Sequence, residues 1–143
     1  MKDCNFINPS KAVNAREFSP LALAYVGDGI YEVYVRDYII SRGNAPVNKL
    51  HKAARNFVRA ESQSLMYHKI EKVLDEEETL VLKRGRNAKS VSSPKNADVC
   101  TYRKATGVEA LIGYLYLEGK FDRIAYLMNI GIKEIVEKVE GAM

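Results

Sequence analysis

The sequence predicts a helical protein, and three observations support this fold class. A Ser19-Pro20 pair stands where an N-cap and the first helical position would fall. Apolar side chains then recur at intervals of three and four, at Ile30, Tyr31, Tyr34, Val35, Tyr38 and Ile39. The stretch 47–74 repeats this spacing with a polar opposite face. Long stretches with this period are typical of helices that pack on a core.

The first helix is predicted from Pro20 to Arg42-Gly43, where the glycine can end it. Local propensity leaves one alternative. The segment 26–30, Val-Gly-Asp-Gly-Ile, also resembles a turn, and the Tyr, Val and Ile content that follows suits a strand. The recurrence of apolar residues favours the helix over a hairpin.

The remaining elements follow in order. We expect a second helix over 47–74, with His51 and His68 at its surface or core edge rather than as metal ligands. A third helix is expected to start in the acidic run 75–78, where the helix dipole favours negative charge and where the acids would be solvated. Another is predicted around Glu109, ending near Gly119, and a last helix or pair over 121–140. Gly107 and Gly113 predict a close backbone approach to the first helix.

Composition indicates one globular domain, covering residues 1–143. The chain is 47% hydrophobic and 28% charged, which is too apolar for a disordered chain. Cys4 and Cys100 are too few for a disulfide framework or a zinc site, so we expect the protein to reside in the reducing cytoplasm. The N-terminal residues have no apolar run of signal-peptide length, and acids and an arginine interrupt the long apolar stretch from Leu21 to Ile40, which excludes a membrane span.

Positive charge is concentrated in residues 83–104, which hold seven basic side chains and one acid. Glycine, serine and proline predict an exposed basic loop over about 83–98. Such a patch favours a polyanionic partner, and the absence of aromatic residues from 84 to 97 argues against stacking on single strands. The alternative is an ordinary solubilising loop. The candidate RNA-binding residues are Lys83, Arg84, Arg86, Asn87, Lys89, Lys95, Arg103 and Lys104.

Two acids lie on helical faces that are otherwise mainly apolar or small. Asp28 shares its predicted face with Leu21, Tyr25 and Val35, and Glu109 shares its face with Ile112 among others. If the two helices pack together, the carboxylates meet, the pKa of one rises, and a divalent cation would relieve the repulsion. Alternatively, each acid pairs with an arginine or lysine. For Glu32, one turn beyond Asp28, the simpler interpretation is an ion pair with Arg36.

These motifs together resemble the ribonuclease III endonuclease domain. The segment 26–30 is similar to that family's signature helix, 108–117 to its second acidic helix, and Arg84-Gly85 to its Arg-Gly element. The sequences 21–28, 32–36, 82–90, 94–96 and 109–111 are most similar to Mini-ribonuclease III, the small bacterial form that lacks a double-stranded-RNA-binding domain. The resemblance covers about residues 15–125.

The resemblance implies an all-α homodimer that cleaves double-stranded RNA, leaving 5′-phosphate and 3′-hydroxyl ends. It implies that Asp28 and Glu109 are the catalytic and metal-binding residues, with Mg²⁺ as the cofactor and Mn²⁺ as a substitute. The implied substrate is the 23S ribosomal RNA precursor, together with a ribosomal protein as a partner. The chain departs from ordinary ribonuclease III at Leu21, Ala24 and Thr106, where that family has acids.

The missing acids leave two other functions open. One is a non-catalytic duplex-RNA-binding factor in ribosome assembly, which would bind RNA without cutting it. The other is a helical protein-interaction module, whose binding would not weaken steeply with salt as phosphate contacts do.

Overall fold

The computed structural model describes residues 14–89 and 98–140, which form helices and their connections. A 3₁₀ turn, Ala15–Glu17, precedes α1 (Pro20–Ser41), α2 (Val47–Val58), α3 (Ala60–Ile70), α4 (Glu76–Asn87), α5 (Val99–Leu117) and α6 (Phe121–Ile135). A second 3₁₀ turn, Glu71–Val73, follows α3, and a short π-helical segment, Val136–Glu140, extends α6. The described residues contain no strand, which confirms the helical fold class.

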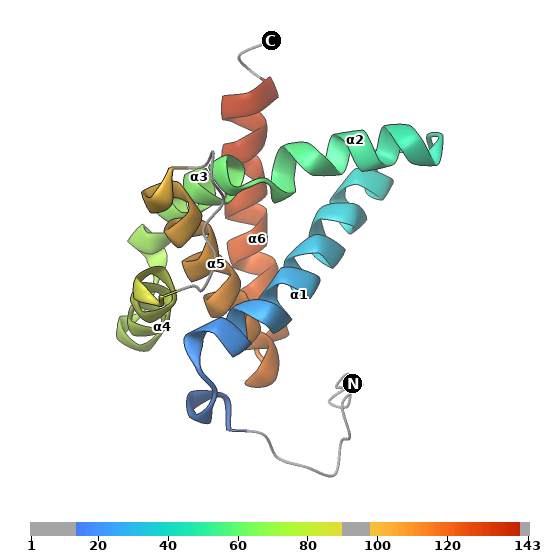
Figure 1. Ribbon diagram of the computed structural model, residues 1–143. Coiled ribbons are helices and arrows are strands. Elements are labelled where there is room, and N and C mark those ends of the chain that lie inside the picture. The colour runs from blue at the N-terminus through green and yellow to red at the C-terminus, as the bar shows by residue number, and fades with distance from the viewer. Residues whose placement is uncertain (1–13, 90–97, 141–143) are drawn as a thin grey trace.

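Helix α5 is the centre of the fold. It packs against α1, α3, α4 and α6 (Figure 1), and every residue from Ala105 to Leu115 except Glu109 is buried. The largest fully buried side chains come from five of the helices and include Tyr31, Met66, Leu82, Leu111 and Leu127. Glu109 is therefore held on a helix that other helices enclose on several sides.

Helices α1 and α5 cross in direct backbone contact. A Cβ on Gly27 would overlap the carbonyl oxygen of Glu109, and one on Gly113 would overlap the carbonyl oxygen of Leu23. Only glycine permits so close an approach. The predicted role of Gly113 is confirmed, and the contact places the turn of α1 that carries Asp28 beside Glu109.

Gly107 has a different neighbour from the predicted one. It faces α4, where a Cβ on Gly107 would lie 2.8 Å from the carbonyl oxygen of Leu82, and a Cβ on Gly85 would lie 2.7 Å from the Cβ of Ala110. Gly85 thus lets α4 continue to Asn87. The prediction of a loop from residue 83 was wrong for residues 83–87, because this glycine serves helix packing and does not break the helix.

The predicted helix over 47–74 is two helices. Arg59 has an extended backbone, with φ −70° and ψ 156°, and separates α2 from α3. The carbonyl groups at the end of α2 find side-chain donors instead of a further helical turn: Ser62 Oγ donates to Asn56 O, and Gln63 Nε2 donates to Val58 O at 2.9 Å. The apolar spacing continues through the break, so periodicity alone did not reveal it.

The acidic run before α4 is a helix start, as predicted, but it is not wholly solvated. Asp75 and Glu78 form a capping box, in which each side chain accepts from the other residue's backbone N–H. Glu78 is 4% exposed and pairs with Arg123 of α6 through two contacts of 2.8 Å. Burial opposes ionisation of Glu78, but the hydrogen bonds from Arg123 and from the Asp75 backbone lower its pKa overall.

Helix α1 is continuous through residues 27–29, so the hairpin alternative is wrong. Ser19 caps it, accepting from the Ala22 N–H at 3.2 Å, and Glu32 pairs with Arg36 at 3.0 Å, as predicted. Its buried residues are Leu23, Ala24, Gly27, Tyr31 and Val35. Each helix in the described ranges is too short or too polar to serve as a membrane span.

Candidate active site

Asp28 and Glu109 lie together where α1 crosses α5. Burial, and then the charge of Asp28, raise the pKa of Glu109 to about 8, and a hydrogen bond with Asp28 acts in the same direction. The sequence predicted that two carboxylates would meet and that one pKa would rise. Both expectations are confirmed: the two acids meet, and the raised pKa is that of Glu109.

The surroundings of Asp28 differ from those predicted. Its side chain is exposed, and so are Leu21 and Tyr25 on the face that was expected to be an apolar stripe. The buried face of α1 is instead centred on Gly27, because this glycine packs against the backbone of α5. The pair therefore joins one partly buried acid to one that solvent reaches, which gives a site that is open from outside.

Gln63 is a residue of this site that sequence reasoning missed. Its Nε2 donates to Glu109 Oε2 at 3.3 Å, and this hydrogen bond lowers the pKa of Glu109 against the effects of burial and Asp28. Its own exposed fraction is 2%. A glutamine among apolar helix positions was the available signal, but only the α2–α3 break places it against Glu109.

The donor set fits a divalent cation of the hard, oxygen-preferring kind. The carboxylates of Asp28 and Glu109 lie together. Among the residues that the structure describes, the partners of Glu109 are Gln63 and Asp28 rather than an arginine or lysine. Mg²⁺ is held in many proteins by one or two carboxylates, with water and substrate phosphate as the other ligands. Over those described residues, no group of three or more His, Cys, Asp or Glu side chains forms a larger metal site.

Those predicted RNA-binding residues that the structure describes lie on α4, just after it, and at the start of α5. Lys83, Arg84, Asn87, Lys89 and Arg103 reach the surface. Two others are in contact with α3. Arg86 donates to the Tyr67 hydroxyl at 3.0 Å, and the Lys104 ammonium lies 2.9 Å from His68 Nε2. Lys95 lies outside the described residues. Of the predicted loop, residues 88 and 89 follow α4, and residues 90–97 lie outside the described part of the chain.

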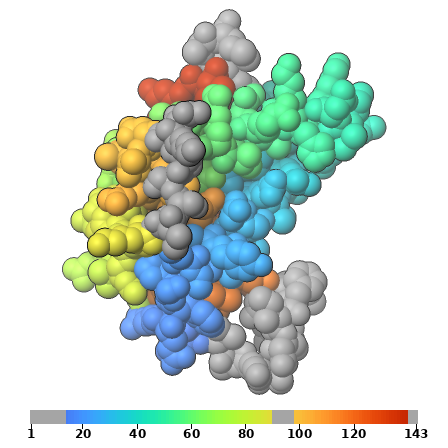
Figure 2. Space-filling view, in the orientation of Figure 1, coloured from blue at the N-terminus to red at the C-terminus, as the bar shows by residue number. Residues whose placement is uncertain are grey.

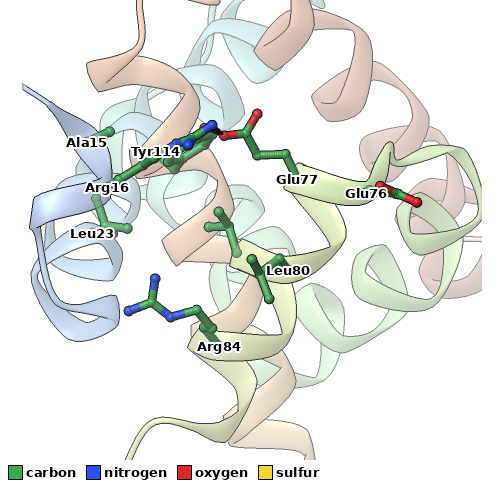
Figure 3. Close-up of a pocket in the computed structure, with 9 residues that line it drawn as sticks. Ala15, Arg16, Leu23, Glu76, Glu77, Leu80, Arg84 and Tyr114 are labelled. Atoms are coloured by element: carbon green, nitrogen blue, oxygen red, sulfur yellow. Dashed lines mark hydrogen bonds and ion pairs between the residues drawn. The ribbon is translucent and has the colours of Figure 1, made fainter.

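Arg84 also lines an open cavity of about 440 Å³ between α1, α4 and the first 3₁₀ turn. Figure 3 shows its guanidinium extending from α4 toward α1. On the other side of this cavity Glu77 pairs with Arg16 and accepts from the Tyr114 hydroxyl at 2.8 Å. The acids Asp28 and Glu109 do not line it, so this cavity is separate from the acid pair.

A second basic surface lies on α2 and was not predicted. Residues 47–59 contain no acid, and four exposed basic side chains follow one another there, namely Lys49, Lys52, Arg55 and Arg59. Three of them line a shallow hollow of about 410 Å³ at the end of α2. Helix α2 projects at the upper right of the molecule (Figure 2). A count of charges over residues 47–59 alone would have found this surface. The net charge of the whole chain does not reveal it, because acids elsewhere offset these cations.

Comparison with known proteins identifies the family to which this fold belongs. A family model described as the ribonuclease III domain matches residues 21–120, a range that includes Asp28, Gln63 and Glu109. The chain belongs to the ribonuclease III family. The match begins in α1 and ends just before α6, so it covers the crossing of α1 and α5 and both acids of the site.

Within the ribonuclease III family, similar curated proteins are called Mini-ribonuclease 3. One from Enterococcus faecalis is 50% identical over 87% of this chain and 96% of its own length. One from Clostridium tetani is 49% identical over 82% of this chain and 78% of its own. A crystal structure of protein FN1578 from Fusobacterium nucleatum is 39% identical, with a TM-score of 0.75 over 84% of this chain and 96% of that one. The predicted resemblance is confirmed.

Proposed function

We propose that this protein is a Mg²⁺-dependent endoribonuclease that cleaves double-stranded RNA by hydrolysis, leaving 5′-phosphate and 3′-hydroxyl ends. The observation that carries the proposal is the meeting of Asp28 and Glu109, where burial, and then the charge of Asp28, raise the pKa of Glu109 to about 8. Family membership and the Mini-ribonuclease 3 relatives support the same reaction class.

Asp28 and Glu109 would hold the metal ion, with Mn²⁺ able to replace Mg²⁺. The bound ion would supply an activated water and stabilise charge on the scissile phosphate. The chain's own contribution is to fix Glu109 on the buried helix α5 and to leave Asp28 open to the substrate. Glu109 must be ionised to act as a ligand, and the charge of a bound cation would favour the ionised form over the protonated one.

Duplex RNA would be held through its phosphates rather than its bases. The exposed cations of α4 and the start of α5, together with the basic face of α2, offer contacts to the phosphates. A-form RNA is recognised mainly by shape and backbone, which suits such a set of Lys and Arg. Exposed apolar side chains on α1, at Leu21, Tyr25 and Val33, support a homodimer in which two sites each cut one strand. The substrate we propose is the 23S ribosomal RNA precursor, with a ribosomal protein as a further partner.

The test incubates the protein with a blunt RNA duplex and Mg²⁺, and then repeats the assay with Asp28→Asn and Glu109→Gln. We expect both variants to lose cleavage by at least about 100-fold while they still bind the duplex. Asp37→Asn, which removes an exposed acid from the same helix α1, is the matched control and should cleave normally. Binding without cleavage by the unmodified protein would favour the assembly-factor alternative. Unchanged cleavage in both acid variants would reject the site.

A further inference from the structure

Gln63 is fixed by a hydrogen bond that identifies its two polar atoms. It lies in the first turn of α3, just beyond the break at Arg59, and its side chain reaches back to the Val58 carbonyl at 2.9 Å. A backbone carbonyl only accepts hydrogen bonds, so the atom that faces it must be the amide nitrogen. The same nitrogen lies 3.3 Å from Glu109 Oε2, and the amide is therefore oriented to donate to Glu109.

The corner between α2 and α3 holds this amide in place. The last three carbonyls of α2 each accept from a buried or partly buried side chain: Asn56 from Ser62, Phe57 from the Tyr31 hydroxyl at 2.6 Å, and Val58 from Gln63. Because three separate donors fix the corner, Gln63 has little freedom to turn away. Of these three donors, Gln63 is the one that also donates to an acid of the candidate site.

The buried amide is not what a purely apolar core would select. Gln63 is 2% exposed, and its Oε1 is buried without a hydrogen-bond partner within the described part of the chain. A buried polar atom left unpaired lowers stability, a cost that an apolar side chain of the same length would avoid at that atom. Because Gln63 is present in spite of this cost, we expect it to hold its other partner, Glu109, in position.

We propose that Gln63 is a positioning residue that holds the Glu109 carboxylate in the orientation that binds the divalent cation. Glu109 has three rotatable bonds before its carboxylate, and the packing of α5 fixes its backbone but not its tip. The Gln63 amide holds Oε2 of Glu109 and leaves Oε1 of Glu109 free to contact the cation. This inference rests on the proposed function, because it takes Asp28 and Glu109 as the metal ligands.

The test measures Mn²⁺ binding to the whole protein without RNA, by electron paramagnetic resonance, beside cleavage and duplex binding. Gln63→Met keeps the length of the side chain and removes the donor. We expect Mn²⁺ affinity to fall by about 10-fold or more, the usual effect of losing a hydrogen-bond partner of a metal ligand. The turnover rate should fall, while the Kd for duplex RNA measured without metal stays the same.

Ser62→Ala is the matched control, because it removes a donor from the same corner without touching Glu109. It should leave Mn²⁺ affinity unchanged. An equal loss of affinity in Ser62→Ala and Gln63→Met would overturn the inference and indicate a general role in folding of the corner. If Gln63→Met does not fold, Gln63→Asn, which withdraws the amide by one methylene, is expected to show the same loss of affinity.

The acid variants separate the two proposals. If Asp28→Asn and Glu109→Gln leave Mn²⁺ binding intact, the metal site itself is wrong. If both abolish Mn²⁺ binding and Gln63→Met binds as tightly as the unmodified protein, the site stands and the role of Gln63 is refuted.

Discussion

Gly27 of α1 lies against the backbone carbonyl of Glu109, so closely that no side chain fits between the two helices. The residue after this glycine is Asp28, and the residue that it touches is the second acid. The distance between the two carboxylates is therefore set by a glycine contact between backbones. The packing of the two helices and the geometry of the proposed metal site are therefore controlled at the same point of the fold.

Gly27→Ala is expected to lower both stability and activity. Its Cβ would overlap Glu109 O and lie 2.8 Å from Gly113 N, so α1 and α5 must move apart. Overpacking of this kind lowers stability by about 1–3 kcal/mol, and it would also separate the acids. Thermal unfolding and a cleavage assay measure the two effects.

Gly29→Ala is the control for this substitution. A Cβ at Gly29 meets nothing within 4 Å, and alanine favours a helix over glycine by about 1 kcal/mol. The melting temperature should stay the same or rise slightly. A similar loss of stability in both variants would show that close packing at Gly27 is not the cause.

Glu109→Gln should change how stability depends on pH in the metal-free protein. Burial and then the charge of Asp28 raise the pKa of Glu109 to about 8 in the folded state, above its ordinary value of 4.5. The folded protein then holds a proton that the unfolded chain has lost, so stability falls as the pH rises from about 4.5 to 8. The glutamine variant should lack this fall and be more stable than the unmodified protein at pH 8. Denaturant unfolding at several pH values in a chelator is the measurement, and parallel curves for the two proteins would contradict it.

Removing charge from α2 should weaken duplex binding and its dependence on salt. The double variant Lys52→Gln/Arg55→Gln removes two exposed cations from a segment with no acid. Each cation withdrawn from an RNA phosphate reduces the slope of log K against log salt by about 1. Lys72→Gln/Lys133→Gln, which changes the net charge equally on other surfaces, should bind nearly as the unmodified protein does. Equal weakening by the two pairs would mean that only net charge matters.

Arg123→Met should destabilise the protein by about 3–5 kcal/mol, because it leaves the Glu78 carboxylate buried without its cation. The Glu78 side chain is 5% exposed, and Arg123 also donates to the Val73 carbonyl at 2.8 Å. The double variant Glu78→Gln/Arg123→Met removes the buried charge as well and should recover part of that loss. Chemical denaturation of the single and double variants measures the coupling, and additive losses would argue against a buried pair.

The boundaries of α1, the start of α4 and the pairing of Glu32 with Arg36 could be predicted because each depends on residues within one or two helical turns. The resemblance identified Asp28 and Glu109 for a similar reason, since two short motifs carry it. The break at Arg59 could not be predicted in this way. The donors that replace the missing helical bonds of α2, Ser62 and Gln63, act only once α3 has turned back.

The sequence by itself determined the helical fold class, the family and the two candidate acids, because periodicity, capping residues and motifs are local properties of the chain. Tertiary structure decided that Asp28 is open and Glu109 is not, that Gly85 lies inside a helix, and that Gln63 donates to Glu109. These facts depend on which helix faces which: glycine contacts set the approach of α1 and α4 to α5, and the break at Arg59 sets where α3 turns back.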